Sequence, residues 1–184
     1  AIWRANAAVQ QAAFGNAAEA RQSAAEALKL APASQGVESE TALAFAMAGD
    51  TARAESLAQH LGKRFPLDTQ MQSLWLPAIQ GQLALDKKNP AAALTALQAA
   101  SPIELGQIAF ISNISCLYHV YVRGEAYLAS GQGSAAAAEF QKIICVAPQA
   151  MACGVTRRIS YRSMCLRRRG CSISSCSPSP CDRH

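Results

Sequence analysis

Aromatic residues and long apolar runs are both scarce in this chain of 184 residues. Only 6% of the residues are aromatic although 51% are apolar, so alanine and leucine make up much of any core. Small residues suit closely packed helices, whereas a sheet favours valine, isoleucine and aromatic residues. No run of about 18 apolar residues occurs, which predicts no transmembrane helix. The start lacks the apolar segment of a signal peptide, so we expect a cytoplasmic protein, and its first residue, alanine, suggests a fragment or a processed chain.

Cysteine is nearly absent from residues 1–143, which contain Cys116 alone, here interpreted as a small buried apolar residue. These residues carry ten Lys or Arg and eleven Asp or Glu, a net charge of −1. Residues 144–184 carry seven Arg, no Lys and one Asp, a net charge of +6. The remaining cysteines all lie in this second part: Cys145, Cys153, Cys165, Cys171, Cys176 and Cys181. Two compositions therefore meet near Ile144, and we expect the organised domain to precede it.

Small residues recur at helical spacing in residues 15–32. Ala20, Ala24 and Ala27 are four and three positions apart, so they share one helical face that lets another helix approach closely. The same order of turn, small-residue face and final proline returns 34 residues later, in residues 49–66. The corresponding residues there are Ala54, Ala58 and Leu61. This recurrence predicts a stack of helix hairpins.

Two later units carry the pattern with wider spacing. The last unit has it most completely, at Gly124, Tyr127, Ala136, Phe140, Ile143 and Pro148. A weaker unit precedes it, at Gly81, Ala84, Ala93, Leu97 and Ala100. The key alanines Ala20, Ala54, Ala93 and Ala136 are 34, 39 and 43 residues apart. The first helices of the third and fourth units should therefore be longer.

The period and the pattern together resemble the tetratricopeptide repeat, a helix–turn–helix unit of about 34 residues. The resemblance covers residues 1–148 and implies an all-α, right-handed superhelix of about four helix hairpins. The units are expected at about 1–34, 35–68, 69–101 and 112–148. Residues 82–110 and 122–143 are also similar to the C-terminal repeat region of large bacterial serine/threonine protein kinases. The chain has no kinase glycine-rich loop, HRD or DFG motif, so the resemblance implies no catalysis.

Turn residues, prolines and caps set the expected helix boundaries. The expected helices are residues 2–14, 17–30, 35–48, 51–65, 69–87, 90–100, 113–130 and 134–144. Pro77 lies inside the long helix that Asp68 caps, and we expect a kink there because apolar periodicity continues on both sides. Residues 101–104 have the order of a capping box and should open a short helical turn.

A superhelix of this kind leaves a concave groove lined mainly by the first helix of each hairpin. We therefore expect a non-catalytic scaffold that binds a peptide or protein segment in the groove. The candidate groove residues are Glu38, Thr41, Gln72, Trp75, Gln82, Tyr118, Arg123 and Tyr127. The residues expected to pack the repeats are Ala20, Ala24, Ala27, Pro32, Ala54, Ala58, Leu61, Pro66, Ala93, Leu97, Gly124, Tyr127, Ala136, Phe140 and Pro148. The alternative function is a regulatory or localising region of a kinase whose catalytic domain is absent from this chain.

No arrangement of residues typical of a catalytic, cofactor or metal site is evident. His60 and His119 lie in different units, without an acidic residue at ligand spacing, and we interpret both as structural. Glu38 and Glu40 are two positions apart, so they should point to different sides of a helix and not act as a pair. We expect no enzyme, no cofactor and no bound metal.

The last part of the chain, residues 149–184, is expected to be a basic Cys/Arg/Ser-rich tail of low order. Its cysteines form no C-x₂-C pair, which argues against zinc. Arg157–Arg158 and Arg167–Arg169 favour nucleic acid only weakly, because Tyr161 is the single aromatic residue among them. The abrupt change of composition is also what a frameshift in a GC-rich gene would yield. Without a covering helix pair, the end of the superhelix should favour self-association.

Overall fold

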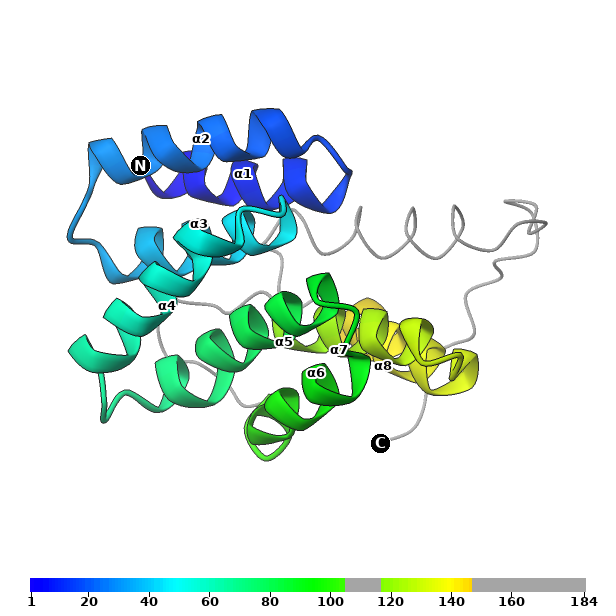
Figure 1. The fold of residues 1–184 in the computed structure, drawn as a ribbon. Coiled ribbons are helices and arrows are strands. Elements are labelled where there is room, and N and C mark those ends of the chain that lie inside the picture. Colours follow the sequence, from blue (N-terminus) through cyan, green and yellow to red (C-terminus); the bar gives the residue numbers. More distant parts are fainter. Residues whose placement is uncertain (105–116, 147–184) are drawn as a thin grey trace.

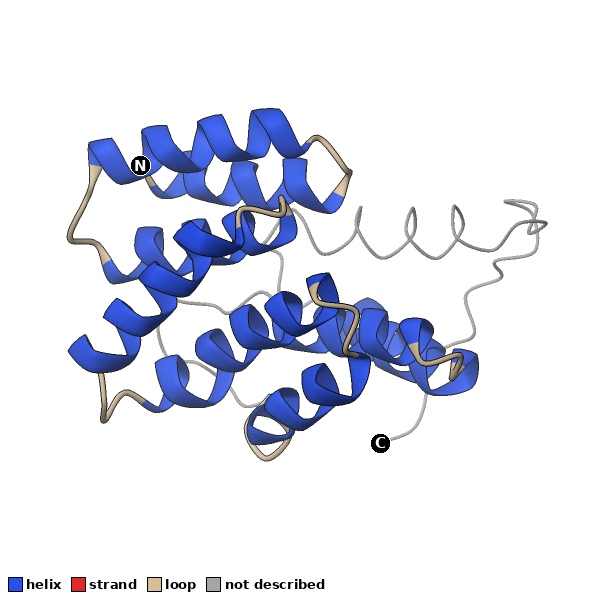
Figure 2. Ribbon diagram, in the orientation of Figure 1, coloured by secondary structure: helices blue, strands red, loops and turns tan. Residues whose placement is uncertain are grey.

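A computed structural model gives the fold and describes residues 1–104 and 117–146. Within these ranges the regular structure is entirely helical (Figure 2). The α-helices are α1 (Ile2–Ala13), α2 (Ala17–Leu30), α3 (Gln35–Met47), α4 (Thr51–Arg64), α5 (Leu76–Asp86), α6 (Pro90–Leu97), α7 (Tyr118–Ala129) and α8 (Gly133–Val146). The all-α class predicted from the sequence is confirmed for the described residues.

The helices pair in order along the chain: α1 packs on α2, α3 on α4, α5 on α6, and α7 on α8 (Figure 1). The first helices of these hairpins also pack in series, α1 on α3, α3 on α5 and α5 on α7. Each second helix contacts the first helix of the next hairpin, as α2 contacts α3 and α4 contacts α5. Each hairpin therefore buries one face against the next, which is how repeat proteins are built.

Small side chains make these close contacts. In α2, Ala20, Ala24 and Ala27 are fully buried. The corresponding residues of α4 are Ala54 and Leu61, both fully buried, and Ala58, which is 8% exposed. In the later hairpins the buried residues of the pattern are Gly81, Ala93, Leu97, Ala100, Gly124, Ala136, Phe140 and Ile143. Pro32 and Pro66, expected to pack the repeats, are instead exposed because they lie in the turns between hairpins. Helix α3 has no solvent face over residues 37–46, because α1, α2, α4 and α5 surround it.

The long helix expected at residues 69–87 is continuous, but its first part is wound more widely. Met71–Trp75 form a π-helical turn that leads directly into α5. Pro77 has no N–H group, and in a straight α-helix its ring would clash with the carbonyl of Ser73. The π-helical turn lies directly before this proline, and both features are known causes of a kink in a helix. Asp68 caps the helix as expected, since its Oδ1 accepts a hydrogen bond from the backbone N–H of Met71 at 2.8 Å.

Two expectations around the link to α7 are corrected. Residues 101–104 form turns, and the carboxylate of Glu104 binds Arg123 and Lys142 instead of closing a capping box. Helix α7, expected to extend through Leu117, begins instead at Tyr118, because Leu117 has a φ of 55°, which lies outside the right-handed helical region. Residue 113, where the helix was expected to begin, lies outside the described residues. Cys116, Pro148 and the expected tail at 149–184 lie outside the described residues.

Candidate functional site

Most residues expected to line a concave groove lie in the core instead. Glu38, Thr41, Trp75, Tyr118 and Arg123 are between 0% and 6% exposed. The other three, Gln72, Gln82 and Tyr127, are half-buried. A buried side chain offers little surface to a partner, so we correct the first five from groove positions to core positions.

Glu38 was expected in the groove, but it is buried in an ion pair with Arg64. Its carboxylate accepts two hydrogen bonds from Nη1 of Arg64, at 3.0 and 2.8 Å, and Nη2 of Arg64 donates to the carbonyl of Ala33 at 2.7 Å. These bonds join the start of α3 to the end of α4. Among the others, the Thr41 hydroxyl donates to the carbonyl of Val37, and the Gln72 amide donates to that of Phe65. The bonds of Glu38 and Gln72 therefore connect different elements, whereas the bond of Thr41 stays within α3.

Arg123 belongs to a buried network of two cations and two carboxylates. Its Nη2 lies 2.5 Å from Oε2 of Glu104 and 2.6 Å from Oε2 of Glu139. Nζ of Lys142 lies 2.9 Å from Oε1 of Glu104 and 3.0 Å from Oε1 of Glu139. Burial alone would raise the pKa of Glu104, but hydrogen bonds from Lys142 and Arg123 hold it below its usual value. Because every carboxylate oxygen has a cationic partner, the network fastens residues 101–104 to α7 and α8.

The two histidines of the described region differ in their surroundings. His119 is 1% exposed, and burial lowers its pKa to about 4, so the ring is neutral near pH 7. His60 lies on the surface with its Nε2 4.0 Å from Oε1 of Glu38, a proximity that their sequence separation did not reveal. Across residues 1–104 and 117–146, no group of three or more His, Cys, Asp or Glu side chains is placed to hold a metal ion.

Glu40 is a buried carboxyl group whose burial the sequence did not predict. It is 7% exposed, and burial raises its pKa to about 7, although a hydrogen bond with Asn6 lowers it. Nδ2 of Asn6 also lies 3.4 Å from the hydroxyl of Tyr118, whose ring is 5.8 Å from that of Trp75. Asn6 of α1 thus contacts both Glu40 of α3 and Tyr118 of α7. As expected, Glu38 and Glu40 point to different neighbours, α4 and α1.

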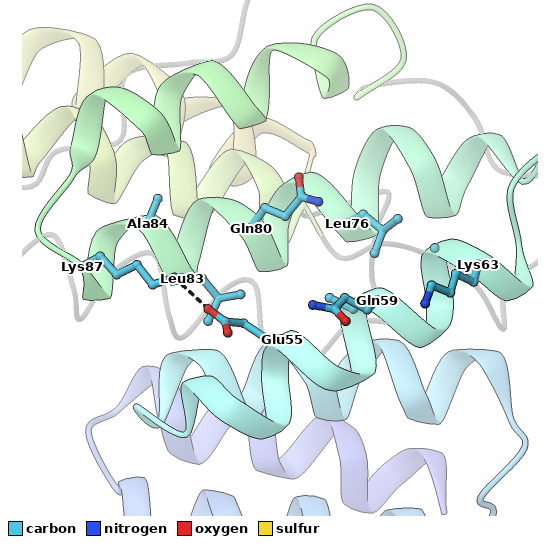
Figure 3. Close-up of a pocket in the computed structure, with 10 residues that line it drawn as sticks. Glu55, Gln59, Lys63, Leu76, Gln80, Leu83, Ala84 and Lys87 are labelled. Carbon is cyan, nitrogen blue, oxygen red and sulfur yellow. Dashed lines mark hydrogen bonds and ion pairs between the residues drawn. The ribbon is translucent and has the colours of Figure 1, made fainter.

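The described surface is hollowed between α4 and α5 by a cleft of about 570 Å³ (Figure 3). The lining residues are Glu55, Ala58, Gln59, Gly62, Lys63, Leu76, Gln80, Leu83, Ala84 and Lys87. Apolar and small residues form the floor, where Leu76 and Leu83 are each 7% exposed. Polar side chains of both helices form the rim.

The cleft exists because its walls carry small residues on facing helices. A Cβ atom added to Gly62 would lie 3.4 Å from Cδ1 of Leu76, so even one methyl group would touch the opposite wall. At one end of the rim, Nζ of Lys87 pairs with Oε1 of Glu55 at 2.7 Å. Lys63 marks the other end (Figure 3). The sequence pattern predicted Ala58 as a packing residue, but it did not reveal the cleft, because the two walls come from different hairpins.

No helix in the described ranges is both long and apolar enough to cross a membrane. Comparison of the chain with protein-family models, with curated proteins and with solved structures found no match.

Proposed function

We propose that this chain is a non-catalytic interaction module of the tetratricopeptide type that binds a short protein or peptide segment. The serial packing of first helices, together with the buried alanine pattern, supports a right-handed superhelix of about four hairpins. The observation that carries the function is the cleft between α4 and α5, with its apolar floor and polar rim. Such a combination of apolar contact and a few polar groups is typical of ligand sites.

The state of the ionisable side chains supports a module without chemistry. A general acid or base must reach the proton that it transfers. Glu40 and His119 are buried, and the carboxylates of Glu104 and Glu139 are bound to Arg123 and Lys142. We therefore assign these groups to folding.

A second candidate is a regulatory or localising region of a bacterial serine/threonine protein kinase. The similarity of residues 82–110 and 122–143 to such regions supports it, and the second stretch coincides with most of the α7–α8 hairpin. Both candidates give the chain a binding role. They differ in whether the module acts as a scaffold or regulates or localises a kinase domain. Genomic sequence encoding a kinase domain upstream in the same reading frame would favour the second.

A peptide selection tests the binding role. The full chain is immobilised, a random peptide library is displayed against it, and enriched peptides are measured by fluorescence anisotropy. We expect saturable binding that Ala84→Trp abolishes by filling the cleft. Ala91→Trp is the matched control, since Ala91 is an exposed residue of α6 outside the cleft. Circular dichroism establishes that both variants remain folded.

If the selection enriches no peptide that binds saturably, the proposed function is wrong. Binding that survives in Ala84→Trp and disappears in Ala91→Trp would place the binding surface elsewhere and contradict the assignment of the cleft.

A further inference from the structure

We infer that the cleft between α4 and α5 takes a short peptide segment in which a large apolar side chain is followed or preceded by acidic residues. This inference rests on the proposed function and adds the chemistry of the partner. Three features of the cleft carry it: the size of its floor, the amides on its rim and the distribution of charge along its length.

The floor favours one or two apolar side chains. Leu76 and Leu83 of α5 face Ala58 of α4 across it, and all three are no more than 8% exposed. A volume of about 570 Å³ lies within the range of small-ligand sites, so it suits a few residues of a peptide and not a folded domain. A large apolar side chain would lie against Leu83 in the space beside the small residues Ala58 and Ala84.

The rim carries amides on both walls. Gln59 of α4 and Gln80 of α5 are exposed side chains that lie above the floor (Figure 3). Neither amide hydrogen-bonds to another side chain or to the backbone in the described parts of the chain. An amide offers both donors and an acceptor, so it can bond the backbone of a peptide whatever its sequence. These two residues therefore favour a peptide over an apolar small molecule.

The charge of the rim is unbalanced along its length. Glu55 and Lys87 neutralise one another at one end. Lys63 at the other end has no ion-pair partner within residues 1–104 and 117–146, so the lining has a net positive charge there. A basic peptide would have to displace Lys87 from Glu55, whereas an acidic residue meets Lys63 without breaking a pair. None of the lining residues that the structure describes is an aromatic residue on which a nucleotide base would stack, which favours an acidic peptide over nucleic acid.

Matched peptides test this chemistry on the full chain. Three fluorescein-labelled peptides share a central Leu-Phe pair and carry on both flanks Asp, Ser or Lys respectively. At about 50 mM salt we expect the Asp peptide to bind several-fold more tightly than the Ser peptide, and the Lys peptide to bind weakest. Raising the salt to about 500 mM should reduce this preference, because the rim is exposed and its charge is screened.

Two charge reversals locate the preference. Lys63→Glu should reverse the order, so that the Lys peptide binds more tightly than the Asp peptide. Lys29→Glu makes the same change of net charge at an exposed residue of α2 outside the cleft, and it should leave the order unchanged. A preference that responds equally to both reversals would reflect net charge alone and would overturn the inference.

The outcomes separate this inference from the proposed function. Equal affinity for the three peptides, or displacement of the Asp peptide by a single-stranded oligonucleotide from the same site, overturns the acidic-peptide inference. If library peptides bind the chain but none of these three does, the inference fails and the interaction module stands. If neither library peptides nor these three bind, both fail.

Discussion

Gly124 sets how closely α7 and α8 approach one another. A Cβ atom at this position would lie 2.5 Å from Cε1 and 2.7 Å from Cζ of Phe140. That ring also packs against Tyr121 at 5.9 Å between centroids, which limits its movement. We expect Gly124→Ala to lower the free energy of unfolding by about 1–3 kcal/mol through overpacking. Urea denaturation followed by circular dichroism measures this.

Gly133, at the start of α8, provides the matched control for Gly124. A Cβ atom there would meet nothing within 4 Å, so Gly133→Ala should change the free energy of unfolding by less than about 0.5 kcal/mol. If the two variants had the same midpoint, the close approach of Gly124 to Phe140 would be contradicted.

The buried carboxyl of Glu40 gives the fold a pH dependence. Its pKa rises from 4.5 to about 7 because of burial, opposed by the hydrogen bond with Asn6. The folded chain holds this proton more tightly, so the contribution to stability is complete below pH 4.5 and is lost as the pH rises to about 7. A pKa shift of this size corresponds to about 3 kcal/mol in the free energy of unfolding. Glu40→Gln should therefore raise the free energy of unfolding at about pH 8 and change it little at about pH 4.5.

His119 gives the stability of the fold the opposite pH dependence, so replacing Glu40 should change how stability varies with pH. Burial lowers the pKa of His119 from 6.5 to about 4, so its contribution is present above pH 6.5 and is lost as the pH falls towards 4. Of these two opposing effects only that of His119 remains in Glu40→Gln, and unfolding measured in urea across this range should show stability rising with pH. A variant whose pH profile equals that of the original chain would contradict the burial of Glu40.

At the residue scale, the sequence predicted the burial of small residues but not the burial of charged ones. Helical spacing placed Ala20 and Ala54 on a packed face, and both are fully buried. The same reasoning put Glu38 and Arg123 at a groove, because charged residues are rarely buried unless paired. Their partners lie 16 to 26 residues away in sequence, and only the packing of different helices brings them together.

At the element scale, most helix boundaries follow from turn residues. Gly15, Gly49 and Gly131 have φ values of 86°, 77° and 74°, which glycine adopts readily, and each lies at a predicted hairpin turn. The start of α7 could not be predicted in this way. Leu117 adopts a positive φ, and no local signal in the sequence marks a leucine for that conformation.

The contact between α3 and α4 is built around a small buried residue of α4. Ala54 is fully buried within the cluster that contains Leu43 and Phe45 of α3. We expect Ala54→Leu to lower the free energy of unfolding by roughly 1–3 kcal/mol, because the interface has no space for a larger side chain. Ala52→Leu is the control, since Ala52 is exposed on the same helix. Thermal and urea denaturation should separate the two, and equal midpoints would mean that Ala54 is not at the interface.

At the scale of the whole molecule, the sequence predicted the order of the hairpins better than the surface they create. A repeated pattern indicates that units stack, because each unit has the same face to bury. The cleft between α4 and α5 depends on how the small residues of one hairpin oppose those of the next, including Gly62 and Ala84. The contact of Asn6 with Tyr118, 112 residues apart, is likewise a product of the stack and not of any local spacing.

Protection from hydrogen exchange should therefore fall from the middle of the stack towards its start. Helix α3 packs against α1, α2, α4 and α5, and residues 37–46 are all buried, whereas α2 packs against α1 and α3 and keeps many exposed positions. In a stack of neighbouring hairpins, terminal units open locally at a lower cost than central ones. We expect the amides of α3 to exchange more slowly than those of α2 by at least about tenfold, measured by mass spectrometry on the full chain. Equal protection of α2 and α3 would instead show that the first two hairpins open as one cooperative unit.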